Sequence, residues 1–521
     1  MPDYLFLLES RLSVQQRAVV ARVQEVALAA GSNVYLTGGA VRDLISGMPI
    51  RDLDFTVEGS PARLARELEK ADAAGPGTGP ARLLEENERL RHIEMLFPGD
   101  VDVSISAARN EVYDYPGAKP EFHFSTITDD LRRRDFTLNA IAISLNPASR
   151  GLLLDPTNGL ADLERREVRA MLNHSFTNQP VRLLRIVRFC ERMNFKMEQR
   201  TADWFALALE RKLQESLEGA PVGLEVQQLA REEKPSAVLR QWENRGLIGV
   251  IHPQLARRHP DYDGISSTCK VRDSLLAAGY TPGGVTRALA APMTWQVLGR
   301  LKSRERSSAL SRMEISRRAA DAVLSLEDQA AKAVKVLMGR KTASARDAFN
   351  FSDQLPLEQL IFIMAEFRQA KALGKIKSYV QKWRPLRLAL PAAELEALGV
   401  PRGPKFDKIL EKLFDVQLQG RGRAPEDRTR LLRQFAGLKP EPKKKMEEPL
   451  PKVKGKKSAA APGVAEKLKH AAAGKHASAA APAKKAAPPP AAPTKPAAKR
   501  AAKGARPPRR MRKHARKKLR R

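Results

Sequence analysis

The stretch LTGGAVRDLISGMPIRDLDFTV, residues 36–57, constrains this chain more than any other. An expected strand leads into two adjacent glycines, a short helix around VRDLI follows, and a second strand, DLDFTV, closes the unit. Residues i and i+2 of a strand share a face, so Asp52 and Asp54 present their carboxylates together while Leu53 and Phe55 point into a core. Two such charges are costly unless something binds them. The pattern is therefore typical of a metal site, a phosphate site or a solvated strand edge.

A third acid, Asp102, lies on another expected strand in FPGDVDVSIS. If that strand pairs beside the first, three carboxylates converge. Oxygen ligands suit Mg²⁺, and two metal ions can clamp the attacking and leaving oxygens of a phosphoryl group. The turn at Gly38 and Gly39 precedes a helix whose N–H groups and dipole favour a triphosphate, and Arg42 adds positive charge there. Either motif alone usually means a strand face or a turn, but the joint pattern is far more restrictive.

The surrounding sequence predicts an α+β fold. Ser60-Pro61 opens a helix, RLRHIEMLF and VDVSISA are strands, and a capping box at Thr126 opens a helix running through DDLRRRDFTLNAIAISL. From Asp155 onward strand signals largely vanish and amphipathic helices follow. The expected domains are a small mixed α/β head, a neck, a helical body and a tail, at residues 15–150, 151–215, 216–436 and 437–521.

The net charge of +33 is concentrated at the C-terminus. Residues 451–521 contain 23 Lys and Arg, a single acid and no aromatic residue. Such a segment cannot bury a core, so we expect it to be disordered. A flexible polycation binds polyanions by counterion release, which predicts contact with nucleic acid. A solubilising tail is the alternative.

The two cysteines, Cys190 and Cys269, show no metal-ligand spacing and fit a reducing cytoplasm. The N-terminus does not resemble a signal peptide, and no run approaches the roughly 20 apolar residues that span a bilayer. We therefore expect a soluble cytoplasmic protein with no membrane span.

Arg182, Arg185 and Arg188 recur every three residues in VRLLRIVRF. On a helix they fall within a stripe of about 120°. With no acid close by in the sequence, the stripe indicates an anionic ligand. A solvated surface stripe is the alternative.

Four motifs together resemble one known family. GGAVRDLISGMPIRDLDF closely resembles the first motif of the tRNA nucleotidyltransferase and bacterial poly(A) polymerase family, in the class II branch of polymerase-β-like nucleotidyltransferases. LRRRDFTLNAIAI, LLDPTNGLADLERREVRAM and VRLLRIVRF resemble its second, third and fourth motifs, in order and at sensible spacing. The resemblance is strong over about residues 15–215 and loose beyond.

The resemblance implies roles for the matching residues. Asp52 and Asp54 would hold two Mg²⁺ ions, with Asp102 as a third catalytic carboxylate. The RNA 3′-hydroxyl would attack the α-phosphate of the incoming nucleotide and release pyrophosphate. The residues implied to bind the nucleotide are Gly38, Gly39, Arg42, Arg134, Asp135, Asn139, Gln179, Arg182, Arg185 and Arg188.

One position departs from the family pattern. Where the family has Glu-Asp before the fourth motif, this chain has Asn178-Gln179. In the family, the Asp and an Arg read the base edge, and a carboxylate can only accept the exocyclic amine of cytosine or adenine. Gln179 can accept through Oε1 but can also donate, and it holds Arg182 less tightly because it is uncharged. The departure leaves open the choice among CTP, ATP and both.

The leading hypothesis is template-independent transfer of CMP or AMP from CTP or ATP to an RNA 3′ end, with the CCA end of tRNA as the expected target. Poly(A) polymerase or A-only addition is the alternative within the same chemistry. A non-catalytic RNA-binding or ribosome-associated protein is the alternative of a different class. The chain contains no His-Asp dipeptide, so we expect no HD phosphohydrolase activity. The helical body is expected to cradle the tRNA acceptor arm.

Overall fold

The computed structural model describes residues 3–70, 79–112, 114 and 120–439. These residues belong to one compact unit, residues 1–443. Most of the segment AAGPGTGPA, residues 73–81, and nearly all of the basic tail lie outside the described residues.

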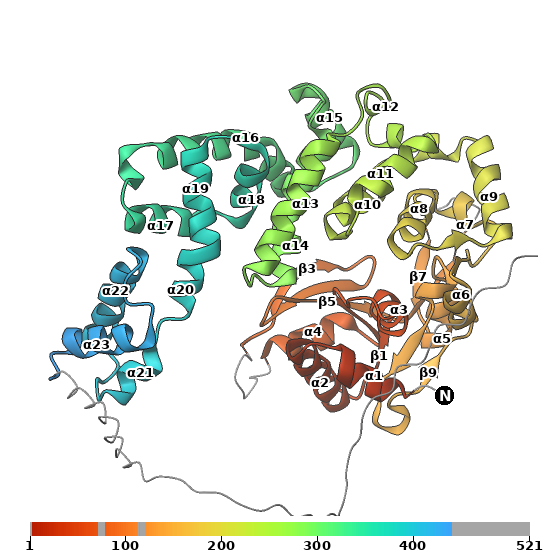
Figure 1. Cartoon of the computed structure of the whole chain (residues 1–521). Helices are drawn as coiled ribbons and strands as arrows, with labels where there is room; N and C mark the ends of the chain where they lie inside the picture. The colour runs from red at the N-terminus through yellow and green to blue at the C-terminus, as the bar shows by residue number, and fades with distance from the viewer. Residues whose placement is uncertain (1–2, 71–78, 113, 115–119, 440–521) are drawn as a thin grey trace, which may run out of the picture. The chain divides into compact units, whose positions relative to one another are not determined.

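The head is built on a seven-stranded sheet with the order β3-β4-β5-β2-β1-β8-β9 (Figure 1). Its strands are β1 (Asn33–Thr37), β2 (Leu53–Glu58), β3 (Arg82–Asn87), β4 (His92–Phe97), β5 (Val101–Ala107), β8 (Ala142–Ser144) and β9 (Leu153–Leu154). β2 pairs in parallel with β5, and the other pairs are antiparallel. Alternate residues of β5 are buried, so its polar residues share the opposite face. The α+β fold class is confirmed.

Helices cover one face of this sheet. The head helices are α1 (Tyr4–Arg11), α2 (Val14–Ala29), α3 (Gly38–Ser46) and α4 (Pro61–Lys70). α2 and α4 pack against each other and against the sheet (Figure 1). α4 begins where the sequence predicts, with the N–H of Arg63 donating to Oγ of Ser60 at 3.4 Å.

The prediction of a long helix after Thr126 is wrong. α5 (Ile127–Arg132) ends early, a single 3₁₀ turn η1 (Thr137–Asn139) follows, and the apolar residues after it form β8. The carboxylate of Asp135 accepts the N–H of Phe136 at 2.8 Å and the side-chain amide of Asn139 at 3.0 Å, so local side-chain bonds replace the helical ladder. β8 then pairs with β1 and buries its side chains in the sheet.

Sequence reasoning also missed a strand at one edge of the sheet and both strands of a separate ribbon. β3 pairs with β4 at one edge of the sheet. A separate two-stranded ribbon joins β6 (Arg109–Val112) to β7 (Glu121–Phe124). These segments are rich in charged and exposed residues, so their alternating pattern is weak.

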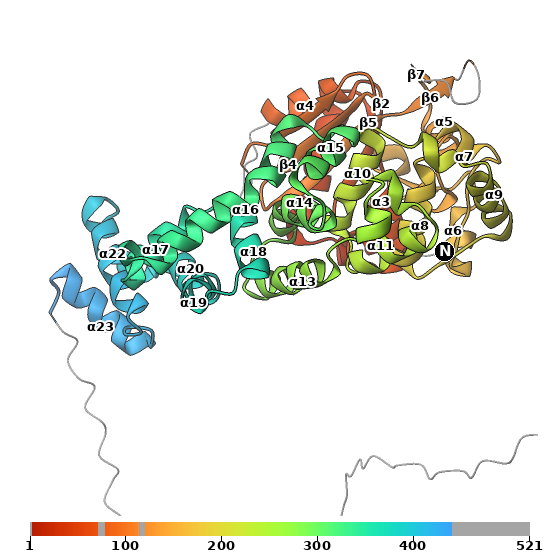
Figure 2. The same ribbon diagram turned by 90° about the horizontal axis from the view of Figure 1, so that it is seen from above.

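The rest of the described chain is mostly helical, as the sequence predicts. Its first helices are α6 (Gly159–Arg165), α7 (Ser175–Asn178), α8 (Arg182–Met193), α9 (Gln199–Glu210), α10 (Ala220–Gln228) and α11 (Pro235–Asn244). They are followed by α12 (Leu255–Arg258), α13 (Tyr262–Ala277), α14 (Pro282–Leu298), α15 (Ser303–Arg312), α16 (Arg317–Met338), α17 (Ala345–Asp353) and α18 (Leu357–Glu366). The last are α19 (Ala370–Ser378), α20 (Arg384–Leu388), α21 (Ala392–Ala397), α22 (Pro404–Leu418) and α23 (Pro425–Ala436). Figure 2 shows α13, α14 and α18 packed together.

The hydrophobic core is continuous from the head into the body helices. A separate small core, which includes Leu395, Phe406 and Leu432, holds α21 to α23 together. The expected boundaries of head, neck and body stay predictions. Within the described residues, no helix has the length and apolar character needed to cross a membrane.

Candidate active site

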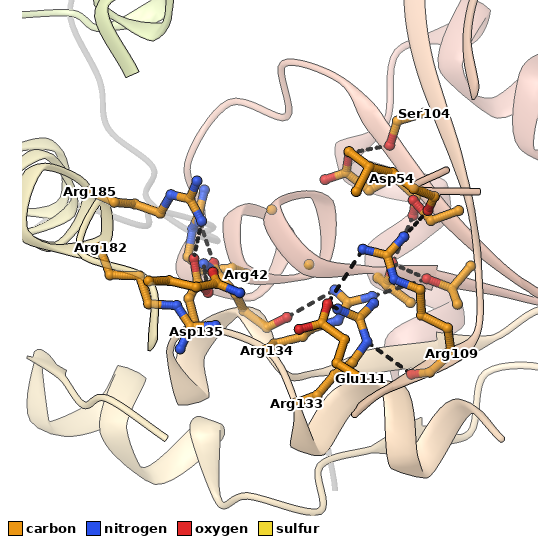
Figure 3. A pocket seen from close by; sticks show the side chains of 18 of the residues that line it. Arg42, Asp54, Ser104, Arg109, Glu111, Arg133, Arg134, Asp135, Arg182 and Arg185 are labelled. Atoms are coloured by element: carbon orange, nitrogen blue, oxygen red, sulfur yellow. Dashed lines mark hydrogen bonds and ion pairs between the residues drawn. The ribbon is translucent and has the colours of Figure 1, made fainter. Parts of the chain in front are cut away.

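The polar face of β2 and β5 forms one wall of a cavity. Their parallel register places Asp54 opposite Ser104 and Thr56 opposite Ser106. The hydroxyl of Ser104 donates to Oδ1 of Asp54 at 2.8 Å (Figure 3). All four side chains, together with Asp52, line a cavity of about 640 Å³. The structure therefore brings the paired carboxylates to a single hollow.

Burial and neighbouring charges act on the Asp54 carboxyl group in opposite directions. Burial raises the pKa of Asp54 to about 6, and the neighbouring charge of Asp52 contributes to the rise. The hydrogen bond from Ser104 and the charges of Arg134 and Arg42 act in the opposite direction. A bound dication would stabilise both carboxylates, and their hard oxygen atoms fit Mg²⁺.

Asp102 does not line this cavity with Asp52 and Asp54, and its catalytic role stays a prediction. Leu53 pairs with Val103, so Asp52 and Asp102 each directly precede the first pair of this register, and the Asp102 carboxylate accepts from Arg287 at 2.6 Å. In the part of the chain that the structure describes, no three His, Cys, Asp or Glu side chains meet as a possible metal site. Arginines from the body reach these strands and engage the acids instead.

The glycine turn lies against the carboxylates. Gly38 has a φ of +62°, and a Cβ there would lie 3.0 Å from Nη1 of Arg134. A Cβ at Gly39 would lie 3.2 Å from Oδ2 of Asp54. Glycine therefore allows the first turn of α3 to approach both side chains closely. The N-terminus of α3 opens on the cavity, where its backbone N–H groups favour an anion.

Arg42, Asn139 and Asp135 form a chain of hydrogen bonds beside this turn. Nη1 of the buried Arg42 donates to Oδ1 of Asn139 at 2.6 Å, and Nδ2 of Asn139 donates to Oδ1 of Asp135 at 3.0 Å. Arg134 donates to the backbone oxygen of Asn139 at 3.1 Å and to the hydroxyl of Thr56 at 3.0 Å. Residues from the first and second motifs are thus locked together on one wall.

The arginine stripe of α8 is not free of acids, which corrects the sequence analysis. Arg185 donates to Glu225 at 2.6 Å and to Asp135 at 3.0 Å. Arg188 is buried and donates to Glu225 at 2.9 Å and to Glu232 at 3.0 Å. The two glutamates are distant in sequence, and the folding of α10 and the following turn brings them to α8. A nucleotide contact for Arg188 stays a prediction.

The arginines of these pairs favour the ionised form of both glutamates. Burial alone would raise the pKa of Glu225, but Arg188 and Arg185 outweigh that effect and hold it below its ordinary value. The pKa of Glu232 is lowered in the same way, because Arg188 and Arg51 outweigh its burial. The cluster is a fixed ion-pair network that joins α8 to the body.

Gln179 and Arg182 lie at the cavity, as the base-reading prediction requires. Gln179 follows α7 directly, and its backbone oxygen accepts the N–H of Arg182 at 3.0 Å. Nη1 of Arg182 donates to the hydroxyl of Ser175 at 2.6 Å. Asn178 faces an adjoining cavity of about 310 Å³, and its Oδ1 is buried with no hydrogen-bond partner among the described residues.

Several lining residues were missed. The β6–β7 ribbon contributes Arg109, Glu111 and Phe122, and Arg133 of the second motif donates to Glu111 at 2.8 Å. The only feature of the sequence that could have pointed to these residues is the charge of the three arginines before Asp135. The side chains lining the cavity include nine arginines and four acids, so the cavity as a whole favours an anionic ligand.

Comparisons with known proteins agree with this architecture. A model of the poly(A) polymerase head domain matches residues 34–169. An A-adding tRNA nucleotidyltransferase from Geobacter sulfurreducens is 26% identical over 406 residues, covering 76% of this chain and 44% of that protein. A CCA-adding enzyme from Marinobacter nauticus is 31% identical over 281 residues, covering 49% of this chain and 68% of that enzyme.

The solved apo form II of a CCA-adding enzyme is 24% identical, covers 84% of this chain and 99% of that chain, and superposes with a TM-score of 0.44. The chain spans less than half the length of the Geobacter protein. The match of residues 34–169 to the head-domain model shows that the head is of the poly(A) polymerase type. The chain belongs to the CCA-adding enzyme family of tRNA nucleotidyltransferases.

Proposed function

We propose that this protein transfers CMP or AMP from CTP or ATP to the 3′ end of RNA, with the CCA end of tRNA as its substrate. The observation that carries the proposal is the pairing of Asp52 and Asp54 beside the N-terminus of α3, in a cavity rich in arginine. Carboxylates for metal ions and N–H groups for phosphates are the two requirements of nucleotidyl transfer.

Asp52 and Asp54 are the residues that would hold Mg²⁺. When bound, the metal supplies positive charge that stabilises the transferring phosphoryl group and the leaving oxygen. The chain positions Asp54 for this task through the Ser104 hydroxyl, which leaves the second carboxylate oxygen of Asp54 available. Burial and the charge of Asp52 raise the pKa of Asp54, and a bound cation would favour its ionised form.

The arginines and the glycine turn would hold the triphosphate. The turn at Gly38 and Gly39 presents N–H groups at the start of α3, and Arg42 and Arg134 flank it. Asn139, held by Arg42 and Asp135, would select the ribose. In the reaction, the RNA 3′-oxygen forms a bond to the α-phosphorus and loses its proton, the bond to the β-phosphate oxygen breaks, and pyrophosphate leaves.

Gln179 and Arg182 would read the base. Oε1 of Gln179 can accept the exocyclic amine of adenine or cytosine, and Arg182 can donate to the ring nitrogen. Relatives of this chain are named A-adding, CC-adding and CCA-adding. The A-adding name of several relatives favours A-only addition as the second candidate function.

The body helices would cradle the acceptor arm, and the basic tail would add contacts that do not depend on sequence. A tRNA substrate would also place the enzyme in the cytoplasm, in agreement with the expectation from its two cysteines.

The test uses three tRNA transcripts that end at the discriminator base, at C and at CC. Each is incubated with the full chain, Mg²⁺ and CTP, ATP or both, and the products are sized to one nucleotide. Ordered addition of C, C and A that then stops supports CCA synthesis. Addition of A to the CC end only establishes the second candidate, and a lengthening A-tail indicates poly(A) synthesis. No incorporation, together with no Mg²⁺-dependent binding of ATP or CTP, would favour the non-catalytic alternative.

A further inference from the structure

Arg231 reaches from the body to the carboxylates of the head. It is the last residue of the 3₁₀ turn η4 (Leu229–Arg231), which follows α10. Its Nη1 forms an ion pair with Oδ2 of Asp52. Both side chains are partly buried, at 26% and 32% exposed. A body residue therefore already occupies an oxygen atom that a metal ion at Asp52 would need.

The surroundings of Arg231 are acidic. The negative charges of Asp52, Asp102 and Glu94 all act on its guanidinium. Arg231 is thus the cation that compensates for several acids at this end of β2, β4 and β5.

The backbone next to Arg231 is held firmly. Glu232 is 1% exposed, and its carboxylate accepts from Arg188 at 3.0 Å and from Arg51 at 3.4 Å. Its backbone oxygen accepts from Arg272 at 2.9 Å. The contact between Arg231 and Asp52 is therefore built into the packing of the body rather than made by a mobile surface side chain.

A second body arginine docks on the head without touching Asp52. Arg287 of α14 donates to Asp102 at 2.6 Å and also pairs with Asp100. Gly283, in the first turn of α14, lies against the backbone of Asp100, since a Cβ at Gly283 would lie 2.1 Å from the backbone oxygen of Asp100. This contact provides a matched control, because removing Arg287 loosens the docking of body and head but leaves Asp52 paired.

We propose that Arg231 is a positioning residue that competes with the metal ion for Asp52, so that metal loading requires Arg231 to leave this carboxylate. The inference rests on the proposed function, because it takes Asp52 as a metal ligand. A carboxylate oxygen that pairs with a guanidinium binds a dication less well. The guanidinium and the dication would also repel each other if both contacted that oxygen. The body thereby sets how readily the head takes up metal.

The test measures Mn²⁺ binding to the full-length chain without nucleotide, from the electron paramagnetic resonance signal of free Mn²⁺. Arg231→Gln is expected to bind Mn²⁺ about tenfold more tightly than wild type, because a charge-assisted bond no longer has to break. Arg231→Lys should bind with an affinity between those two, and Arg287→Gln should match wild type. Equal or weaker binding by Arg231→Gln, or equal tightening by Arg287→Gln, would overturn the proposal.

Two further measurements separate this inference from the proposed function. Asp52→Asn should lose the Mn²⁺ site; if it binds like wild type, the metal-ligand assignment itself fails, and not only the competition. Thermal unfolding guards against a folding defect: Mn²⁺ should raise the Tm of Arg231→Gln more than that of wild type. A smaller rise would also count against competition at Asp52.

Discussion

The carboxylate of Glu225 bonds the guanidinium of Arg188 at 2.9 Å, and the two side chains are only 2% and 6% exposed. Glu225 also binds Arg185, so one body residue holds two arginines of the helix that lines the cavity. The shape of the candidate site therefore depends on an ion-pair network between α8 and α10. Breaking one partner of a buried pair leaves an uncompensated charge, which is strongly destabilising.

Replacing Glu225 should destabilise the folded chain. Glu225→Ala is expected to lower the free energy of unfolding by about 3–5 kcal/mol, because it leaves Arg188 buried with one partner fewer. Denaturant unfolding followed by circular dichroism measures the change. The exposed Glu327 pairs with Arg306 at 3.7 Å and provides the matched control, and Glu327→Ala should change little. Equal effects of the two variants would refute a structural role for the buried network.

The same ion-pair network should make the stability of the folded chain depend on pH. The pKa values of Glu225 and Glu232 are held below the ordinary value of 4.5, so the unfolded chain binds more protons than the folded chain in this range. Stability is therefore fully present above about pH 4.5 and is lost as the pH falls through the folded pKa values. Thermal unfolding between pH 3 and 7 should show a falling Tm below pH 4.5, with a shallower slope for Glu225→Gln. A Tm that rises on acidification would contradict this sign.

Removing the paired carboxylates should abolish chemistry but not RNA binding. Asp52→Ala and Asp54→Ala are each expected to reduce the incorporation rate by about 10³-fold or more, since the metal ions provide several kcal/mol of transition-state stabilisation. Single-turnover incorporation and filter binding to tRNA measure the two properties separately. Substantial remaining activity would mean that the metal ligands lie elsewhere.

Restoring an acid at position 179 should sharpen base selection. Gln179→Asp is expected to raise the preference for ATP over UTP, as a ratio of kcat/KM, by about tenfold, because a carboxylate can accept the adenine amine but cannot donate to uracil. Gln179→Asn is the matched control, with nearly the same size and no charge. If both variants shift the ratio equally, side-chain length rather than charge decides the preference.

Removing the basic tail should weaken RNA binding uniformly. A chain ending at residue 440 is expected to bind tRNA with lower affinity. The slope of the logarithm of the binding constant against the logarithm of the salt concentration should also be flatter, by about 0.9 for each phosphate that the tail neutralises in the full chain. Titrations at several salt concentrations measure this slope. The nucleotide added should stay the same; a changed nucleotide would show that the tail acts on the active site.

The local patterns predicted the head well. Alternation along DLDFTV and VDVSISA identified β2 and β5, and the glycine pair started α3 beside Asp54. The prediction went wrong after Thr126, where helix-like periodicity continued through AIAIS. The hydrogen bonds of the Asp135 side chain and the pairing of β8 with β1 determine the structure of that segment, and a local sequence pattern shows neither of them.

What the sequence by itself determined is the set of reactive groups: the acids on one strand face, the glycine turn, and the arginines spaced along α8. These follow from strand and helix periodicity, which is a property of a few neighbouring residues. Only the tertiary structure decided their partners. Glu225 pairs with Arg188, Arg287 pairs with Asp102, and Arg231 pairs with Asp52. These ion pairs join residues far apart along the chain, and buried charges take whichever partner the packing of the body brings within reach.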